Sequence, residues 1–257
     1  MEVLKNRTKS ALQLMQFNKN TVPFEVPNTQ DQTESEMRHS NRFCGITASV
    51  AKVVAVVHSE RGKYNLLNRI LWGKILPELK CFKYGRQHEE KAFHEYMAEN
   101  AGKDVTIQKR GFWINPLYQE LGCRPDGLVY NQNNKLIGVV EIKCPFVLAG
   151  KDPLCVDELN ANKRNNLCYN VMNGRPFLKK LHQYYYQVQM QIALCEVDFC
   201  DFVIWSSKGM IVKRVLPHIE FWKDLCSKLI SFHHNTLMPE YTEMRIPRQL
   251  MPADIQI

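Results

Sequence analysis

The stretch RPDGLVYNQNNKLIGVVEIKCP, residues 124–145, contains two apolar runs separated by the polar sequence Asn131-Gln132-Asn133-Asn134. Runs of this length that are rich in Val, Ile and Tyr and are bounded by turn residues are typical of β-strands. We therefore predict strands at residues 123–130 and 136–143, with Pro145 ending the second. A turn of Asn and Gln residues between them predicts that the two strands are neighbours in one sheet.

Three ionisable side chains lie at the ends of these two runs. Glu141 and Lys143 share one face of the second strand because side chains alternate along it, and alone they favour an ordinary ion pair at a strand end. Asp126 precedes Glu141 by fifteen residues, so pairing of the strands brings the two carboxylates together. Carboxylates in contact repel each other unless a cation lies between them. Oxygen ligands favour Mg²⁺ or Mn²⁺ over Zn²⁺, which predicts a site for a hard divalent cation.

A third acid lies on a predicted helix at residues 86–100, which Gly85 is expected to open. Glu89 shares a helical face with Ala92, Phe93 and Tyr96, at spacings of three, four and seven residues. An acid that faces the core needs a partner or a metal ion. A surface glutamate whose stem covers apolar atoms is the alternative interpretation of this segment.

A second predicted helix, at residues 47–57 with Thr47 as its N-cap, begins close to Arg42 and Ser49. A helix N-terminus offers free backbone N–H groups and suits a phosphate, to which Ser49 adds a hydroxyl and Arg42 a bidentate contact. On this segment alone, simple capping beside a surface arginine is the favoured interpretation.

A row of glutamines follows the predicted helix 178–195, beside its apolar face. Gln183, Gln187 and Gln191 recur every four residues, whereas Gln189 points about 160° away from Gln187. Gln187 lies nearest the core edge, and its amide is suited to hold a water molecule or a phosphate. A solvated polar row is the alternative.

The remaining pattern predicts an α/β fold with a mixed sheet. Residues 1–40 are predicted to form a flexible leader, because residues 22–41 contain few large apolar side chains. We expect residues 154–177 to form a loop with a short helix, and residues from Pro239 onward to form a tail. The other expected elements are helices at 64–76 and 220–233, strands at 105–108 and 112–114, and a hairpin of strands 199–205 and 210–216.

Composition excludes several classes of protein. The 257 residues are 45 % apolar and 23 % charged, which does not fit a coiled coil, a collagen-like fibre or a wholly disordered chain. The net charge of +8 is compatible with a polyanionic partner.

Nine cysteines without a secretory signal indicate reduced thiols in an intracellular protein, and the absence of C-x-x-C pairs argues against a zinc ribbon. No apolar run is long enough to span a membrane. A nuclear or a cytoplasmic location is left open.

Five short motifs together resemble the YqaJ-like viral recombinase or bacteriophage lambda exonuclease family, within the PD-(D/E)XK nuclease superfamily. They occur in the family's order and are R-x-x-x-I-T-A-S (42–49), G-x-x-x-E (85–89), P-D-G (125–127), E-I-K-C-P (141–145) and Q-V-Q (187–189). The resemblance implies a single domain with a restriction-endonuclease-like mixed β-sheet flanked by helices. It places this nuclease domain at residues 41–236, between the leader and a tail at residues 237–257.

The resemblance also implies roles for the residues of these motifs. Asp126, Glu141 and the backbone carbonyl of Ile142 would hold Mg²⁺, or Mn²⁺ in its place, with assistance from Glu89. Lys143 would orient or activate the attacking water, and Gln187 would lie near the scissile phosphate. Arg42 and Ser49 would bind the 5′-phosphate of a DNA end.

The activity implied is that of a metal-dependent 5′-to-3′ exonuclease on double-stranded DNA ends, used in recombination or repair. An endonuclease of the same superfamily and a DNA-binding module that does not cleave are the alternatives. A homo-oligomer and a strand-annealing partner protein are further expectations from the family, but no residue in the sequence identifies an interface for either.

Overall fold

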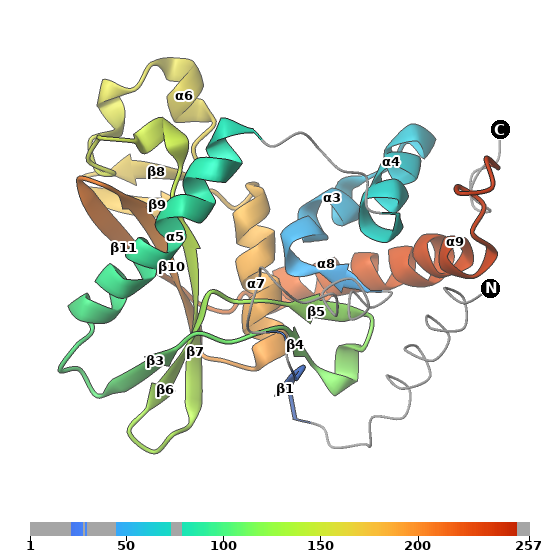
Figure 1. Cartoon of the computed structure of the whole chain (residues 1–257), viewed down its shortest axis with the longest axis horizontal. Helices are drawn as coiled ribbons and strands as arrows, with labels where there is room; N and C mark the ends of the chain where they lie inside the picture. Colours follow the sequence, from blue (N-terminus) through green and yellow to red (C-terminus); the bar gives the residue numbers. More distant parts are fainter. Residues whose placement is uncertain (1–21, 28, 30–44, 73–78, 251–257) are drawn as a thin grey trace.

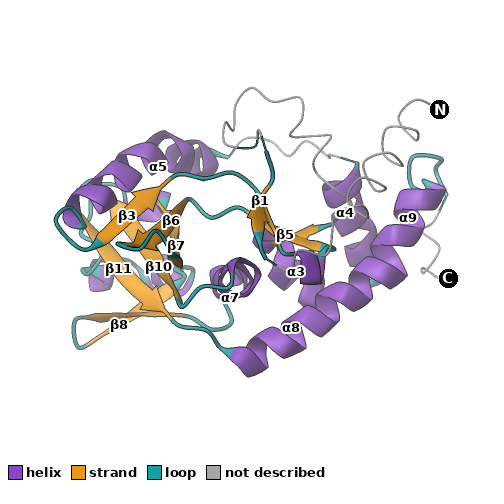
Figure 2. Cartoon of the chain, turned by 90° about the horizontal axis from the view of Figure 1, so that it is seen from below, coloured by secondary structure: helices purple, strands orange, loops and turns teal. Residues whose placement is uncertain are grey.

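The computed structural model describes residues 22–27, 29, 45–72 and 79–250. The chain forms a single α/β domain built around two β-sheets, with helix α7 (Gln183–Cys195) between them (Figures 1 and 2). Helix α5 (Lys80–Glu99) covers the outer face of the larger sheet, and further helices lie beyond the smaller one. None of the described helices has the length and apolarity needed to cross a bilayer.

The larger sheet has five strands and is mixed, which confirms the predicted fold class. Its strand order is β11-β10-β7-β6-β3, in which β7 and β10 are parallel and the other neighbours are antiparallel. Its strands are β3 (Val105–Gln108), β6 (Gly127–Asn131), β7 (Leu136–Lys143), β10 (Phe199–Ser206) and β11 (Gly209–Val215).

The two faces of β7 belong to different parts of the core. Val139 packs in the cluster on the α7 side, whereas Val140 and Ile142 pack in the cluster that includes Phe93 and Tyr96 of α5. This confirms the predicted alternation over the end of the strand that carries Glu141. Ile137 departs from the pattern and packs on the α5 side, because the register between β6 and β7 shifts there.

The smaller sheet was not predicted. Its strands, in the order β1-β4-β5-β2, are β1 (Phe24–Glu25), β4 (Trp113–Ile114), β5 (Leu121–Cys123) and β2 (Ile46–Thr47). The prediction of one strand over residues 123–130 is therefore wrong, because β5 and β6 belong to different sheets. Pro125, which has no N–H to donate, lies in the connection between them. Phe24 and Glu25, within the expected leader, pair with β4.

Most of the predicted helices are present, but several begin at other residues than predicted. Gly85 lies inside α5 rather than at its start, and α7 begins five residues later than predicted, at Gln183. Leu181, which lies within the predicted helix 178–195, precedes α7 and is 79 % exposed. The predicted helix 47–57 is β2 followed by a 3-10 turn (Ala48–Val50) and α3, and the Thr47 side chain makes no capping bond.

The helices beyond the smaller sheet are α3 (Ala51–Val56), α4 (Glu60–Leu71), α8 (Ile219–Phe232) and α9 (Met238–Glu243). Helix α9 contains Pro239, from which a tail was expected. It joins α8 through a π-helical turn at His233–Leu237. Glu240 of α9 is buried and accepts hydrogen bonds from the Trp72 indole and the Ile246 N–H, so this segment is tied to the end of α4.

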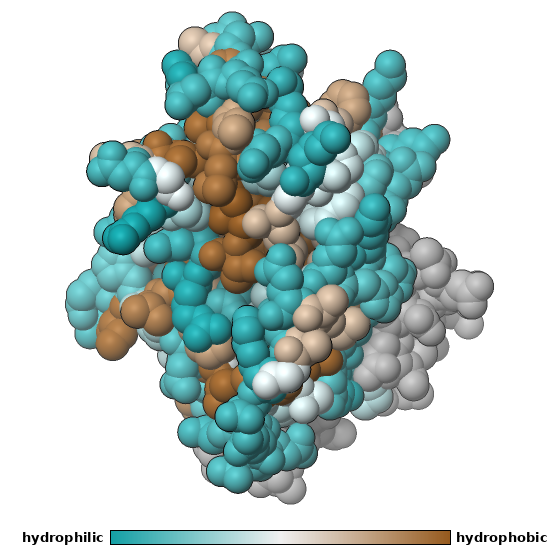
Figure 3. Space-filling model, turned by 90° about the vertical axis from the view of Figure 1, so that its left-hand side faces the viewer, coloured by the Kyte–Doolittle hydropathy of each residue, from teal (hydrophilic) through white to brown (hydrophobic). Residues whose placement is uncertain are grey.

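The segment 154–177 contains the expected short helix, α6 (Ala161–Asn165), and also a hairpin of β8 (Tyr169–Met172) and β9 (Arg175–Leu178) that was not predicted. The hairpin packs beside β11 at the edge of the larger sheet. This side of the molecule shows a band of apolar atoms among hydrophilic ones (Figure 3). Exposed apolar side chains on these elements are Met172, Phe177 and Val212.

Candidate functional site

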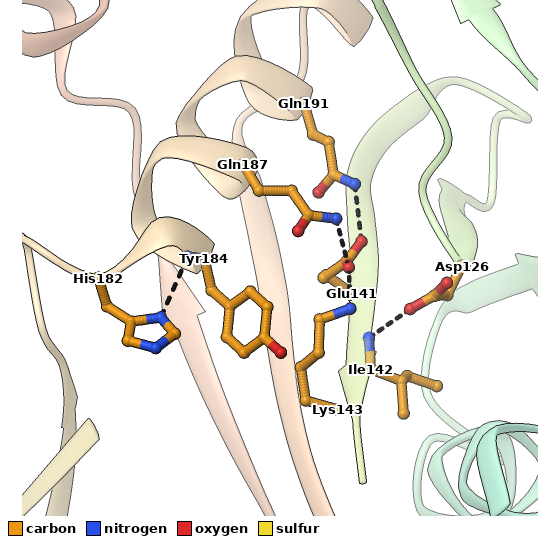
Figure 4. A network of polar contacts seen from close by, with 8 residues as sticks. All are labelled: Asp126, Glu141, Ile142, Lys143, His182, Tyr184, Gln187 and Gln191. Carbon is orange, nitrogen blue, oxygen red and sulfur yellow. Dashed lines mark hydrogen bonds and ion pairs between the residues drawn. The ribbon is translucent and has the colours of Figure 1, made fainter. Parts of the chain in front are cut away.

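Glu141 is the centre of the candidate site, where β7 faces α7. Its side chain is almost completely buried, with the residue 1 % exposed. Gln187 donates from Nε2 to Oε1 of Glu141 at 2.5 Å, and Gln191 donates from Nε2 to Oε2 at 2.7 Å (Figure 4). Lys143 also contacts Oε1. Both oxygens of this carboxylate are thus held by donors from two neighbouring elements.

Asp126 lies in the connection that leads from the smaller sheet into β6. Its Oδ2 accepts a hydrogen bond of 2.6 Å from the N–H of Ile142, and its own N–H donates to the carbonyl of Val140 at 2.9 Å. These bonds bring Asp126 beside the end of β7, as the sequence predicted. Burial and the nearby Glu141 carboxylate raise the pKa of Asp126 well above its usual range.

The residue after Asp126 must be small. A Cβ atom on Gly127 would lie 2.7 Å from the ring of Phe93, a residue of α5. The glycine therefore allows α5 to approach the start of β6 closely. This close approach helps to place Glu89, one turn earlier on α5, near the site.

Glu89 lies on the buried face of α5, as predicted from its spacing to Ala92, Phe93 and Tyr96, which are all buried. Its own side chain is half-buried. Burial raises the pKa of Glu89; Lys143 opposes the shift, and Glu141 adds to it. Glu89 and Asp126 are therefore both close enough to Glu141 for its carboxylate to raise their pKa values.

Lys143 is the cation among these acids. Burial disfavours its charged form, but Glu141 and Asp126 outweigh that effect and raise the pKa of Lys143 above its usual value. Its Nζ lies 5.0 Å from the centre of the Tyr184 ring on α7. A lysine held in the protonated form can donate hydrogen bonds to an oxygen atom, but it cannot take up a proton.

The donor set is compatible with a divalent cation. The site offers carboxylate oxygens, and the raised pKa values of Asp126 and Glu89 are those of acids whose charge is incompletely compensated. In the conformation described, the carboxylate of Glu141 accepts hydrogen bonds from Lys143, Gln187 and Gln191. Among the described residues, no three His, Cys, Asp or Glu side chains lie together as a ready-made group of metal ligands.

The structure brings together six of the predicted site residues and modifies the expectation for one of them. Asp126, Glu141, Ile142 and Lys143 lie together, and Glu89 influences them electrostatically. Gln187 reaches the same place, but its described hydrogen bond is to Glu141.

The predicted phosphate-binding pair is described only in part. Ser49 is exposed in the 3-10 turn that packs against α7, and its Oγ lies 3.2 Å from Oγ1 of Thr47. Arg42 lies outside the described residues. The pairing of Arg42 with Ser49 at a phosphate stays a prediction.

Gln191 is a site residue that our sequence-based choice omitted. It lies one turn after Gln187 in the row of glutamines, so the spacing already placed the two residues side by side. Gln189 faces elsewhere, as predicted: it donates to the carbonyl of Leu216 and accepts from the N–H of His218.

Comparisons with known proteins identify the family of this chain. The sequence model of a family described as the YqaJ-like viral recombinase domain matches residues 36–198. Among curated proteins, none matches the sequence.

Several solved structures share the fold. An alkaline exonuclease, LHK-Exo, from Laribacter hongkongensis is 19 % identical, with a TM-score of 0.57 over 84 % of this chain and 100 % of that one. The same enzyme in complex with dAMP gives a TM-score of 0.59, over 84 % of this chain and 98 % of that one. SOX, in a complex with DNA, is 13 % identical, with a TM-score of 0.51 over 83 % of this chain and 69 % of that one.

Proposed function

Because the chain belongs to the YqaJ-like viral recombinase family, we propose that it is a divalent-metal-dependent deoxyribonuclease. The observation that carries this proposal is the convergence of Asp126, Glu141 and Lys143 at one end of β7. Two acids buried together with a protonated lysine lower the stability of the fold, because each acid makes the charge on the other less favourable. A purely structural role therefore does not explain them. Such a set can hold a divalent cation and donate hydrogen bonds to a phosphate, which suits phosphodiester hydrolysis.

In this proposal, Asp126, Glu141 and the backbone carbonyl of Ile142 hold the ion, and Glu89 assists from α5. A bound Mg²⁺ or Mn²⁺ supplies a water of lowered pKa and offsets negative charge on the phosphate. Lys143, which stays protonated, donates hydrogen bonds to the attacking water or to a phosphate oxygen. Gln187 keeps Glu141 oriented through the bond to Oε1.

Double-stranded DNA is the proposed substrate. The fold is shared with an alkaline exonuclease and with a protein solved in complex with DNA, and the net charge of +8 favours a polyanion. We assign the activity to recombination or repair. The eight cysteines in the described part of the chain are free thiols, which agrees with the proposed location inside the cell.

The finer proposal is digestion from a 5′ end, with Arg42 and Ser49 binding the terminal phosphate. The test compares linear duplex with a 5′-phosphate, linear duplex without one, and closed circular DNA, all in Mg²⁺. We expect fast digestion of the phosphorylated linear duplex and none of the circle. Efficient cleavage of closed circles would instead identify an endonuclease, and DNA binding without any cleavage would contradict the nuclease proposal.

A further inference from the structure

Gln191 occupies an unusual environment for a buried amide. The residue is 0 % exposed, and its Nε2 donates to Oε2 of Glu141 at 2.7 Å. A carboxylate can only accept hydrogen bonds, so the amide nitrogen has to face Glu141 and the amide oxygen has to turn away. That oxygen is buried and has no hydrogen-bond partner among the described residues. A buried acceptor without a donor is unfavourable for folding, so stability alone does not explain a glutamine here.

Gln187 and Gln191 of α7 bind different oxygens of the Glu141 carboxylate (Figure 4). Oε1 receives both Gln187 and Lys143, whereas Gln191 is the described donor to Oε2. Loss of Gln187 would leave Lys143 on Oε1. Loss of Gln191 would leave Oε2 without a donor from the described residues, so that only the donors to Oε1 would orient the carboxylate.

We propose that Gln191 is a positioning residue that fixes Oε2 of Glu141, and thereby the orientation in which this carboxylate meets a divalent cation. The inference rests on the proposed function, because it requires Glu141 to be a metal ligand. Side chains that orient a ligand in this way contribute roughly 10–100-fold to metal affinity or activity.

The test is Mn²⁺ binding to the full chain without DNA, with free Mn²⁺ measured by electron paramagnetic resonance. Gln191→Met keeps the length of the side chain and removes the amide. We expect it to bind Mn²⁺ at least about 10-fold more weakly than the original protein. DNA cleavage by this variant should need a correspondingly higher Mn²⁺ concentration, and added Mn²⁺ should restore part of its activity.

Gln189→Met is the matched control, because Gln189 is equally buried on the same helix but bonds to Leu216 and His218 instead of Glu141. This variant should unfold at a lower temperature in EDTA yet keep the original Mn²⁺ affinity. A general disturbance of α7 would weaken Mn²⁺ binding in both variants, which would count against a specific role for Gln191.

Equal Mn²⁺ affinity in Gln191→Met and in the original protein would overturn the inference while leaving the proposed nuclease in place. If the original protein neither binds Mn²⁺ nor cleaves DNA, the proposed function and the inference both fail. Should Gln191→Met not fold, Gln191→Asn asks the same question, because it keeps a buried amide but is one methylene too short to reach Glu141. The same loss of Mn²⁺ affinity is then expected, and unchanged affinity would overturn the inference.

Discussion

Tyr96 donates a hydrogen bond of 2.8 Å to Oδ2 of Asp201, which joins α5 to β10 across the buried face of the larger sheet. Arg214 of β11 binds the same carboxylate at both oxygens, each at 2.8 Å. Tyr96 lies seven residues after Glu89, two turns along the same face of α5. The contact therefore fixes the rotation of the helix that presents Glu89 to the site.

Tyr96→Phe is expected to lower the free energy of unfolding by about 1–3 kcal/mol, because the Asp201 carboxylate loses a buried donor. Urea unfolding measures this change. Tyr130→Phe on β6 is a suitable control, because no hydrogen bond of its hydroxyl is found among the described residues. Equal stability of Tyr96→Phe and the original protein would show that Arg214 alone holds Asp201.

Asp126→Asn is expected to reduce DNA cleavage by at least about 100-fold, since even the partners of a metal ligand are worth 10–100-fold. The asparagine keeps an oxygen that can accept from the Ile142 N–H, so the fold should persist. Cleavage is followed on linear duplex in Mg²⁺, and DNA binding is followed by fluorescence anisotropy in Ca²⁺. Retained binding with lost cleavage is the expected pair of results, whereas unchanged cleavage would refute the site.

The stability of the metal-free protein should fall as the pH rises above about 4. The folded state raises the pKa of Asp126 well above 3.8 and that of Glu89 above 4.5. Between the unfolded and folded pKa values the folded state binds more protons, so unfolding becomes easier as the pH increases. Thermal unfolding in EDTA across this range measures the slope.

Two comparisons test whether the site acids cause that slope. Asp126→Asn should flatten it, because one of the shifted acids is gone. Mg²⁺ should raise the unfolding temperature most at the higher pH values, where the carboxylates are ionised and can hold the ion. A slope that is the same in Asp126→Asn would place its origin elsewhere in the protein.

Lys143→Met should separate metal binding from cleavage. Removal of the ammonium takes away one of the two donors to Oε1 of Glu141 and leaves the site more negative, so Mn²⁺ should bind more tightly. Cleavage should nevertheless fall, because the donor to the attacking water or to the phosphate is lost. Lys213→Met on β11 changes the net charge equally and lies over the Phe177 ring, so it controls for charge alone. Weaker Mn²⁺ binding in Lys143→Met would contradict this division of roles.

The positions of Glu141 and Glu89 could be predicted from the sequence, because one lies on a strand and the other on a helix with clear periodicity. The predicted bounds of β7 agree with the structure, and Glu89 lies on the expected face of α5. The connection that contains Asp126 was harder to predict, because the apolar residues on both sides of it suggested one continuous strand. Pro125 was the signal that the strand is interrupted.

Two other features could have been found from local signals that carry a physical reason. Asn173-Gly174 is a pair typical of tight hairpins, and both residues have positive φ between β8 and β9. Gln191 was visible in the glutamine row. Its contact with Glu141 could not be predicted, because the spacing of residues on a helix does not say which carboxylate lies opposite them.

The candidate site also depends on how rigidly two layers of the protein are held together. Asp126 belongs to the covalent crossing between the sheets, Glu141 belongs to the larger sheet, and α7, which carries the two glutamines, packs against both. Any sliding of one sheet over the other would alter the separation of the two carboxylates. The stiffness of the whole two-layer body, and not only the packing around each side chain, therefore sets how well these residues can share one ion.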